Sequence, residues 1–285
     1  MATQPISEIA SNYVGFRLAR ILNDNTAALT KSIERLTSGL RIVSAGDDPS
    51  GAAISVKHEN AIARMGAAQD GIANTTDFVE TQSDFLSSVS ESLTRMSELA
   101  VLSQSGSTTD AQRSAYQIEF SQLQLFVSDV GNRSFNQLDL FRTSSLSTVV
   151  NENGGSITLQ SSLNYHATAA LGGFFNVYNP TTVDISATAS AAAAQAAVST
   201  AITNLTVMQS RVSGNITVLN LYDDLLTDAI DNLTATKDRI TAVDTATESA
   251  EFSRLDLLTQ TGTSMIANWN TLRTNLLDLY QFPKI

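Results

Sequence analysis

Both ends of the chain carry long series of apolar residues that recur at alternating steps of three and four. The N-terminal series runs through Leu22, Thr26, Leu29, Ile33, Leu36 and Leu40, and the C-terminal series through Leu258, Gly262, Met265, Trp269, Leu272, Leu276 and Leu279. This spacing places each series on one face of a long helix and is typical of a coiled-coil seam. We therefore expect the two ends to pair with each other and with copies of the same chain, which favours assembly over catalysis.

Composition supports a fold dominated by long helices. The chain has 285 residues with only 4 prolines, and aromatic residues make up 6% of it. Few prolines over this length allow long uninterrupted helices, and seams of Leu, Ile, Val and Ala can replace the aromatic residues of a compact globule. A further series of apolar residues standing seven apart, from Leu205 to Ile240, lies just upstream of the C-terminal one.

Local signals predict where the helices begin and end. The first helix should end near Gly39, and Asp48 followed by Pro49 should cap the start of the next one. We predict helices over roughly 22–41, 49–104, 110–130, 187–243 and 245–280, with Asp110 as the cap of the third and an amphipathic stretch before residue 22. Residues 131–142 should form a turn that returns to an extended segment.

The centre of the chain has a different pattern. Residues 143–188 are rich in Ser, Thr, Gly and Asn, with short alternating runs at 156–159 and 183–185. These runs predict one or two β-hairpins. The expected fold class is therefore mainly α, a long-helix coiled-coil bundle formed by paired N- and C-terminal segments, with a small β-hairpin insert.

Charge and composition exclude several functions. The net charge is −11 and the sequence contains no cysteine. The acidic balance, without a basic patch, disfavours nucleic acid and anionic membranes as partners. No run of eighteen apolar residues occurs, and the first residues lack the basic and apolar regions of a Sec signal, so we expect neither a membrane span nor Sec export.

No constellation of residues indicates catalysis or a cofactor. His58 and His166 lack a second ligand at metal-binding spacing, and no nucleophile, phosphate-loop or dinucleotide motif occurs. The Asp47–Asp48 pair is interpreted as a capped turn. We therefore expect no enzyme activity, no metal and no cofactor.

Five segments carry a resemblance to the bacterial flagellin family. They are Ile33–Ser55 (IERLTSGLRIVSAGDDPSGAAIS), Gln69–Gln82 (QDGIANTTDFVETQ), Leu93–Ser103 (LTRMSELAVLS), Asn132–Phe141 (NRSFNQLDLF) and Asp238–Leu279. The first four resemble the family's N-terminal signature and the last its C-terminal signature. Tyr13, Phe16 and Trp269 depart from the family pattern, which predicts an altered packing of the terminal helices.

The resemblance implies a short member without large outer domains. Residues 1–43 with 246–285 would form an inner coiled-coil domain, 44–142 with 189–245 a helical domain, and 143–188 a hairpin-bearing surface insert. The implied function is a structural subunit that polymerises into the extracellular flagellar filament and gives motility. The resemblance places in the inner assembly core the residues Leu22, Leu29, Ile33, Leu36, Leu40, Leu258, Met265, Trp269, Leu272, Leu276 and Leu279.

The resemblance also implies partners. They are further copies of the chain in a helical homopolymer, the flagellar export apparatus, a flagellin chaperone, and the filament cap and junction proteins. Export through that apparatus accounts for an extracellular protein without a Sec signal. Arg95, Leu99 and Glu119 match positions at which the family is contacted by an animal innate immune receptor.

Three other interpretations compete with a filament subunit. A hook–filament junction protein has similar termini, but a junction protein would be a trace component of a flagellar preparation. A soluble coiled-coil adaptor would form discrete bundles with ordered ends. A cell-wall enzyme grafted onto a flagellin would need a site in the centre, where His166, Asp184 and Glu152 do not make one.

Overall fold

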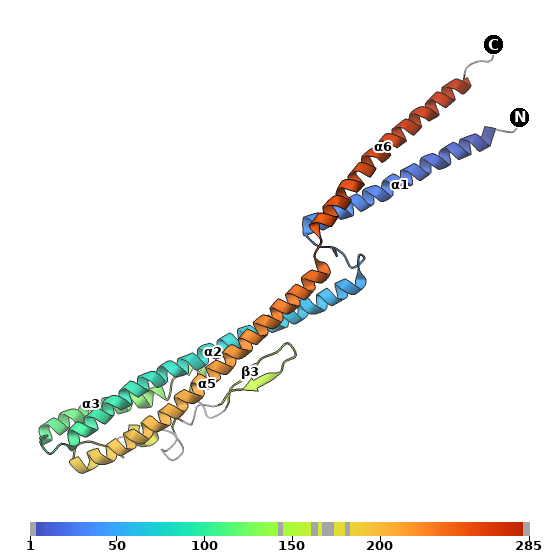
Figure 1. The fold of residues 1–285 in the computed structure, drawn as a ribbon. Helices are drawn as coiled ribbons and strands as arrows, with labels where there is room; N and C mark the ends of the chain where they lie inside the picture. The colour runs from blue at the N-terminus through green and yellow to red at the C-terminus, as the bar shows by residue number, and fades with distance from the viewer. Residues whose placement is uncertain (1–3, 142–144, 161–164, 167–173, 180–182, 282–285) are drawn as a thin grey trace. The chain divides into compact units, whose positions relative to one another are not determined.

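The computed structural model is built from six helices and two small hairpins among its described residues (Figure 1). These are residues 4–141, 145–160, 165–166, 174–179 and 183–281, with side chains described over 13–275 within those ranges. The elements are α1 (Gln4–Ser38), α2 (Pro49–Gln104), α3 (Asp110–Val130), β1 (Ser134–Phe135), β2 (Leu138–Asp139), β3 (Ser147–Val149), β4 (Ser156–Thr158), α4 (Phe175–Tyr178), α5 (Thr188–Thr241) and α6 (Thr245–Gln281). The predicted fold class is confirmed.

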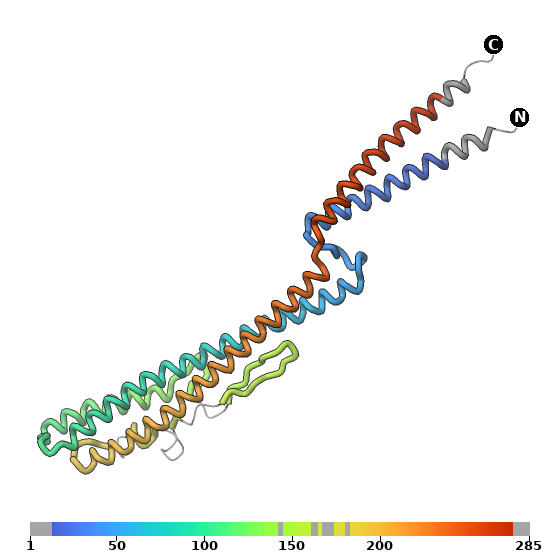
Figure 2. Tube along the Cα trace, viewed as in Figure 1, coloured from blue at the N-terminus to red at the C-terminus, as the bar shows by residue number. Residues whose placement is uncertain are grey.

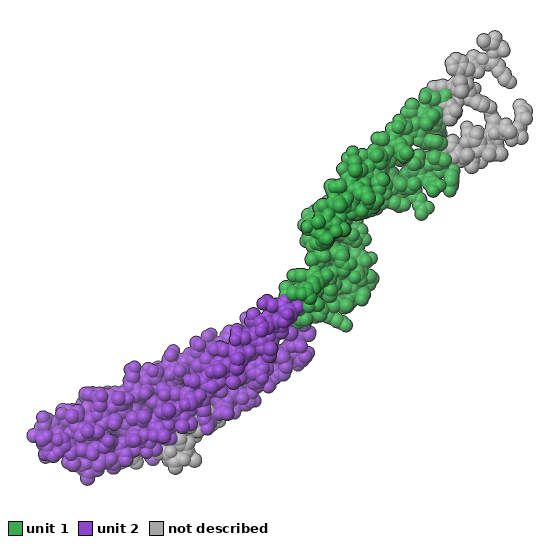
Figure 3. All heavy atoms as spheres, viewed as in Figure 1, with its two compact units in different colours: residues 1–59, 233–285 green, residues 60–232 purple. Residues whose placement is uncertain are grey.

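The chain divides into two compact units, which Figure 3 colours separately. The first unit, here called the terminal unit, consists of residues 1–59 and 233–285. The second, the central unit, consists of residues 60–232. Both units therefore combine segments that are far apart in the sequence, and α2 and α5 each contribute residues to both.

In the terminal unit, α1 and α6 pack side by side and run antiparallel (Figure 2). Most buried and half-buried positions of each helix recur at steps of three and four, as a coiled-coil seam requires. On α1 these are Gly15, Leu18, Leu22, Asn25, Leu29, Ser32 and Leu36, and on α6 they are Leu255, Thr259, Gly262, Ile266 and Trp269. Further half-buried positions are Arg35, Glu248, Glu251, Phe252 and Asp256. Only about half of these side chains are large and apolar, so the intramolecular seam is a weak one.

The connection between α1 and α2 is a capped turn, as predicted. Gly39, with φ of +72°, ends α1 in a left-handed conformation that glycine adopts without strain. Asp48 Oδ1 accepts a hydrogen bond from Gly51 N at 2.9 Å and so caps α2. The turn is pinned to the connection between α5 and α6, since Arg41 N donates to Thr241 O at 2.7 Å and Val243 N donates to Gly39 O at 3.0 Å.

In the central unit, α2 and α5 lie antiparallel and supply most of the core. Polar pairs tie them together near both ends, with Gln69 Nε2 2.8 Å from Thr227 Oγ1 and Gln104 Nε2 2.8 Å from Gln195 Oε1. Residues standing seven apart on each helix are buried, namely Met65, Ile72, Val79, Leu86 and Leu93 on α2, and Leu205, Val212, Leu219 and Leu226 on α5. Gly66 and Gly71 do not interrupt α2, because the burial of these seams outweighs a cost of about 1 kcal/mol per glycine.

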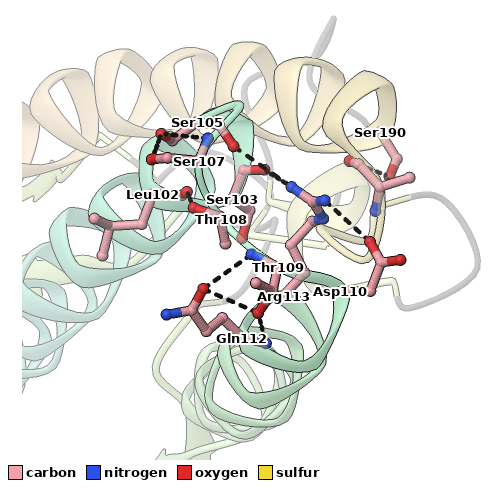
Figure 4. A network of polar contacts seen from close by, with 11 residues as sticks. Leu102, Ser103, Ser105, Ser107, Thr108, Thr109, Asp110, Gln112, Arg113 and Ser190 are labelled. Atoms are coloured by element: carbon pink, nitrogen blue, oxygen red, sulfur yellow. Dashed lines mark hydrogen bonds and ion pairs between the residues drawn. The ribbon is translucent and has the colours of Figure 1, made fainter.

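The start of α3 shows a capping box centred on Thr109, not on Asp110 as the sequence suggested (Figure 4). Thr109 Oγ1 accepts from Gln112 N at 3.4 Å, and Gln112 Oε1 accepts from Thr109 N at 2.9 Å. Asp110 stands one residue later, in the first turn, and pairs with Arg113 Nη2 at 3.0 Å. The capping role falls to Thr109 because its extended backbone turns the hydroxyl towards the free N–H groups.

We predict that Thr109→Ala lowers the free energy of unfolding of the dissociated chain by about 1 kcal/mol, the usual value of an N-cap hydroxyl. Urea denaturation followed by circular dichroism would measure the loss. Ser114→Ala, at an exposed position within the same helix, is the matched control and should change stability by less than about 0.5 kcal/mol. Equal effects of the two substitutions would contradict the assigned cap.

The central segment is less regular than predicted. One hairpin is present, because β3 and β4 pair antiparallel with Thr148 opposite Ile157, and β1 and β2 form a second small pair within 131–142. The run 183–185 is not a strand. Side chains of α3 bind its backbone instead, since Ile185 N donates to Gln117 Oε1 at 2.6 Å and Gln124 Nε2 donates to Val183 O at 3.0 Å.

Candidate assembly surfaces

A second set of exposed apolar residues flanks the seam in the terminal unit and forms an outward stripe. On α6, Leu258, Met265 and Leu272 stand seven apart, and Met265 and Leu272 are 62% and 56% exposed. Ile33 on α1 and Leu40 in the turn after it are also exposed, and Phe16 on α1 is 74% exposed. Large apolar side chains grouped in this manner mark a surface that another molecule covers.

The residues predicted for the inner assembly core are therefore divided between the α1–α6 seam and the exposed surface beside it. Leu22, Leu29, Leu36 and Trp269 are half-buried at the α1–α6 seam, whereas Ile33, Leu40, Leu258, Met265 and Leu272 are exposed. Leu276 and Leu279 lie outside the residues whose side chains are described. Leu255 and Ser32, which the sequence interpretation missed, are buried at the seam. Leu255 could have been found from its position three residues before Leu258.

Glycines allow close packing across the seam. A Cβ at Gly15 would lie 3.4 Å from Trp269 Nε1, and a Cβ at Gly262 would lie 3.2 Å from Leu22 Cδ1. Trp269 thus rests over a glycine of α1 and is accommodated within the seam. The departure from the family pattern at Trp269 is matched by a small partner residue.

Polar groups weaken the same seam. The hydroxyl of Ser32 and Nε of Arg35 are buried without a hydrogen-bond partner among the described residues. Arg35 Nη1 lies 3.7 Å from Glu248 Oε2, which is a long ion pair. Unsatisfied buried polar groups cost free energy, so the isolated α1–α6 pair gains little from its seam.

The turn before α2 holds its carboxylate firmly ionised. Asp47 Oδ2 accepts from Val43 N at 3.1 Å and from Ser44 N at 3.0 Å, and Lys31 Nζ pairs with Asp47 Oδ1. The hydrogen bond from Lys31, followed by the bond from Ser44, holds the pKa of the Asp47 carboxyl well below its usual range.

This shift predicts an acid-sensitive turn. Because the folded pKa is depressed, the stabilisation is complete above the unfolded value of about 4 and is lost as the pH falls towards the folded value. As the pH falls from 5 to 2, the free energy of unfolding of the Asp47→Asn variant should therefore decrease less than that of the unsubstituted chain. Carboxyl carbon NMR of the dissociated chain would check this directly, and an Asp47 midpoint at or above about pH 4 would contradict it.

Arg95 and Glu119 form an exposed ion pair between α2 and α3. Arg95 Nε and Nη2 lie 2.6 and 3.2 Å from the two oxygens of Glu119, and Nη1 lies 2.9 Å from Glu98 Oε2. The hydrogen bond from Arg95 lowers the pKa of Glu119. Leu99, the third residue of the predicted receptor contact, is fully buried. It can support the pair from beneath, but its side chain is not at the surface.

The inner face of α3 binds the insert through glutamines that the sequence interpretation missed. Gln117, Gln124 and Gly131 stand seven apart, and they alternate along the chain with the apolar residues Phe120 and Val127. Gln124 is buried and donates to Val177 O at 2.9 Å as well as to Val183 O. Glutamines repeating at heptad spacing within an apolar face were the signal that could have revealed them.

His166 takes a structural role. His166 Nδ1 lies 2.8 Å from the Tyr178 hydroxyl and its Nε2 lies 3.1 Å from Gly131 O, so both ring nitrogens have protein partners. No three His, Cys, Asp or Glu side chains of the described residues are arranged to hold a metal ion. Over the same residues, no helix is both long and apolar enough to cross a membrane.

Long paired helices with outward apolar stripes define a helical structural protein that associates with other molecules. Comparisons with known proteins identify the family. The profile described as the bacterial flagellin N-terminal helical region matches residues 9–145, and the profile of the C-terminal helical region matches residues 188–280. The chain belongs to the bacterial flagellin family, whose members are structural, non-enzymatic filament subunits.

Individual relatives agree with the family match. The flagellar filament core protein flaB2 of Brachyspira hyodysenteriae is 30% identical over 96% of this chain and 99% of its own length. Flagellin FlaB1 of Treponema pallidum is 28% identical over 91% of this chain and 95% of its own length. A structure of a flagellar hook-associated protein from Vibrio parahaemolyticus has a similar fold, with a TM-score of 0.59 at 16% identity over 69% of this chain and 100% of that one.

Proposed function

We propose that this chain polymerises through its terminal helices into the helical filament of a bacterial flagellum. The outward stripe of Leu258, Met265 and Leu272 on α6 is the observation that carries the proposal. Together with Ile33 on α1 and Leu40 in the turn after it, this stripe offers apolar surface that the described part of the chain leaves exposed. Copies of the chain would bury this surface in the filament.

The weak α1–α6 seam supports a coupling between ordering and assembly. Isolated helices gain most of their stability from packing, and here about half of the seam positions are polar or small. Neighbouring subunits would add the missing apolar contacts and order the terminal helices. A contact that joins two different surfaces of identical subunits repeats indefinitely and produces an open helical filament.

The proposed organisation keeps the three parts expected from the resemblance. Residues 1–43 with 246–285 form the inner domain, 44–142 with 189–245 the helical domain, and 143–188 a short surface insert. Leu22, Leu29, Leu36 and Trp269 pair the two ends of one chain. Ile33, Leu40, Leu258, Met265 and Leu272, together with Leu276 and Leu279, are proposed to contact other copies.

The further partners in this proposal are those that deliver and terminate a filament. They are the flagellar export apparatus, a flagellin chaperone, and the cap and junction proteins. In this proposal the protein acts outside the cell, as part of the filament. Arg95 and Glu119, supported by Leu99, are proposed as an innate-receptor contact through their exposed charged groups.

The fold alone does not separate a filament subunit from a hook–filament junction protein, because both share it. Copy number does separate them. Quantitative gel analysis of sheared flagella should find this chain as a major component, whereas a junction protein would be present in traces. A coiled-coil adaptor would be absent from such preparations.

Electron microscopy of the dissociated and reassembled protein tests the proposal. The full chain should form long filaments, and deleting residues 258–285 should abolish them. Circular dichroism of the truncated chain should still report the helices of the central unit. Monomers that persist in the full chain, with protease-resistant helical ends, would overturn the proposal.

A further inference from the structure

The central unit has a groove of about 750 Å³ between β4 and α5. Ile157 and Leu159 line one side, and Val207, Val218 and Tyr222 line the other. The two walls are held together by an amide clasp, since Asn215 Nδ2 donates to Gln160 O at 3.0 Å and Gln160 N donates to Asn215 Oδ1 at 3.3 Å. The groove is therefore a fixed feature of the fold, and its walls are largely apolar.

A glycine in the α5 wall keeps this groove open. Gly214 is exposed in the middle of α5, where glycine weakens a helix relative to alanine. A Cβ at this position would meet no heavy atom of the described residues within 4 Å. The packing of the described part of the chain therefore does not require glycine here. A glycine would be required if another segment approached the backbone of α5 closely at this position, because a side chain would then be in the way.

Arg211 places a positive charge in the same groove. It is half-buried and is the only charged residue among those lining the groove. No described carboxylate lies within 4.0 Å of its guanidinium, so it forms no ion pair within the described part of the chain. A half-buried guanidinium without a partner favours an occupant that brings a carboxylate.

The outer face of α3 has the complementary character. Ile118, Gln122, Leu125 and Asp129 follow one another at steps of four and three and so form one ridge along the helix. Ile118 and Leu125 are 68% and 63% exposed. Asp129 ends the ridge with an exposed carboxylate, whose Oδ2 pairs with Arg133 just after the helix and whose Oδ1 is left for a second guanidinium, such as that of Arg211 in another copy. On α5, Val207, Arg211, Gly214 and Val218 repeat the same spacing around the groove.

We propose that the α3 ridge of one copy docks into the β4–α5 groove of a second copy. Leu125 and Ile118 cover the apolar walls, the ridge approaches α5 closely at Gly214, and Asp129 pairs with Arg211. The proposal rests on the proposed function, because it assigns one of the repeating contacts of the filament. Ridge and groove are different surfaces of the same chain, as an open polymer requires.

Filling the groove tests whether it is occupied in the filament. Gly214→Leu should raise the critical concentration for polymerisation at least tenfold, while the melting temperature of the dissociated chain stays the same or rises. Gly66→Leu is the matched control, because Gly66 is also helical and also has no heavy atom within 4 Å of its Cβ position among the described residues. It should leave the critical concentration within twofold. The proposal would be overturned if both substitutions raised the critical concentration equally, or if neither raised it.

Cysteine cross-linking identifies the occupant, since the chain has no cysteine of its own. A chain carrying Leu125→Cys and Val218→Cys should give a ladder of covalent oligomers when its filaments are oxidised. A mixture of the two single variants should stop at dimers. Leu125→Cys with Ser213→Cys is the control, because Ser213 is exposed on α5 but does not line the groove.

The outcomes separate this inference from the proposed function. Filaments that give no ladder from the Leu125–Val218 pair would overturn the docking while leaving polymerisation intact. Failure of the unsubstituted chain to form filaments would overturn the proposed function and the docking with it. Ladders from the Leu125–Val218 pair only, with impaired assembly of Gly214→Leu, are the expected results.

Discussion

A chain carrying Met265→Glu and Leu272→Glu should remain monomeric at concentrations at which the unsubstituted chain forms filaments. Both side chains are more than half exposed on α6, so glutamate costs the isolated chain little. In a filament that buries this stripe, each substitution loses about 1.5–3 kcal/mol of apolar burial and adds the cost of desolvating a carboxylate. A combined loss of about 4 kcal/mol corresponds to roughly a thousandfold rise in critical concentration.

Sedimentation of reassembled protein over a range of concentrations would measure this change. Met265→Leu is the matched control, since it keeps an apolar side chain of similar volume at the same position and should assemble normally. The helical content of the dissociated double variant should equal that of the unsubstituted chain. Normal filaments from the double variant would show that the outward stripe of α6 does not carry the assembly contact.

Gln124→Leu should destabilise the central unit by about 2 kcal/mol. The buried amide of Gln124 donates to the carbonyls of Val177 and Val183, and leucine would leave both oxygens without this donor. An unsatisfied buried acceptor costs about 1–3 kcal/mol. Part of this cost is offset. Gln124 Oε1 is buried without a hydrogen-bond partner among the described residues, and leucine would remove this unsatisfied oxygen.

Urea denaturation of the dissociated chain would give the change in the free energy of unfolding. Gln122→Leu, an exposed position on the same helix, is the control and should change stability by less than about 0.5 kcal/mol. Proteolysis should also reach the segment around residues 174–185 sooner in Gln124→Leu, because its backbone would have lost two of its anchors on α3. A stable variant with unchanged proteolysis would mean that the apolar contacts of Val177 and Ile185 suffice to hold the segment.

Most boundaries of the long helices could be predicted closely because they depend on neighbouring residues, but α1 starts well before the predicted residue 22. Asp48–Pro49 starts α2, Gly39 ends α1, and apolar residues seven apart identify the buried faces of α2 and α5. These signals act within one or two turns of helix, so the sequence contains them directly. The run 183–185 was misjudged as a strand because side chains of α3, far away in the sequence, bind its backbone.

The apolar residues of the terminal helices could be predicted as a set, but not which of them α1 and α6 bury against each other. A series such as Leu258, Gly262, Met265 and Trp269 shows that one face of the helix is apolar, whichever molecule covers it. The groove beside Gly214 was beyond prediction for a related reason, since β4 and α5 meet only in the folded chain.

The helical class, the family and the extent of every long helix except the first follow from the sequence, whereas α1 begins at Gln4 and not near residue 22. The folded chain was needed to show that Gly262 and Trp269 face α1 while Met265 and Leu272 face outward, and that glutamines of α3 hold the insert. Helix periodicity and capping are local. Which side of an apolar face is buried depends instead on the size and polarity of the residues across the seam. Small residues such as Gly15 and Gly262 allow α1 and α6 to approach there, while Met265 and Leu272 beside the seam stay exposed.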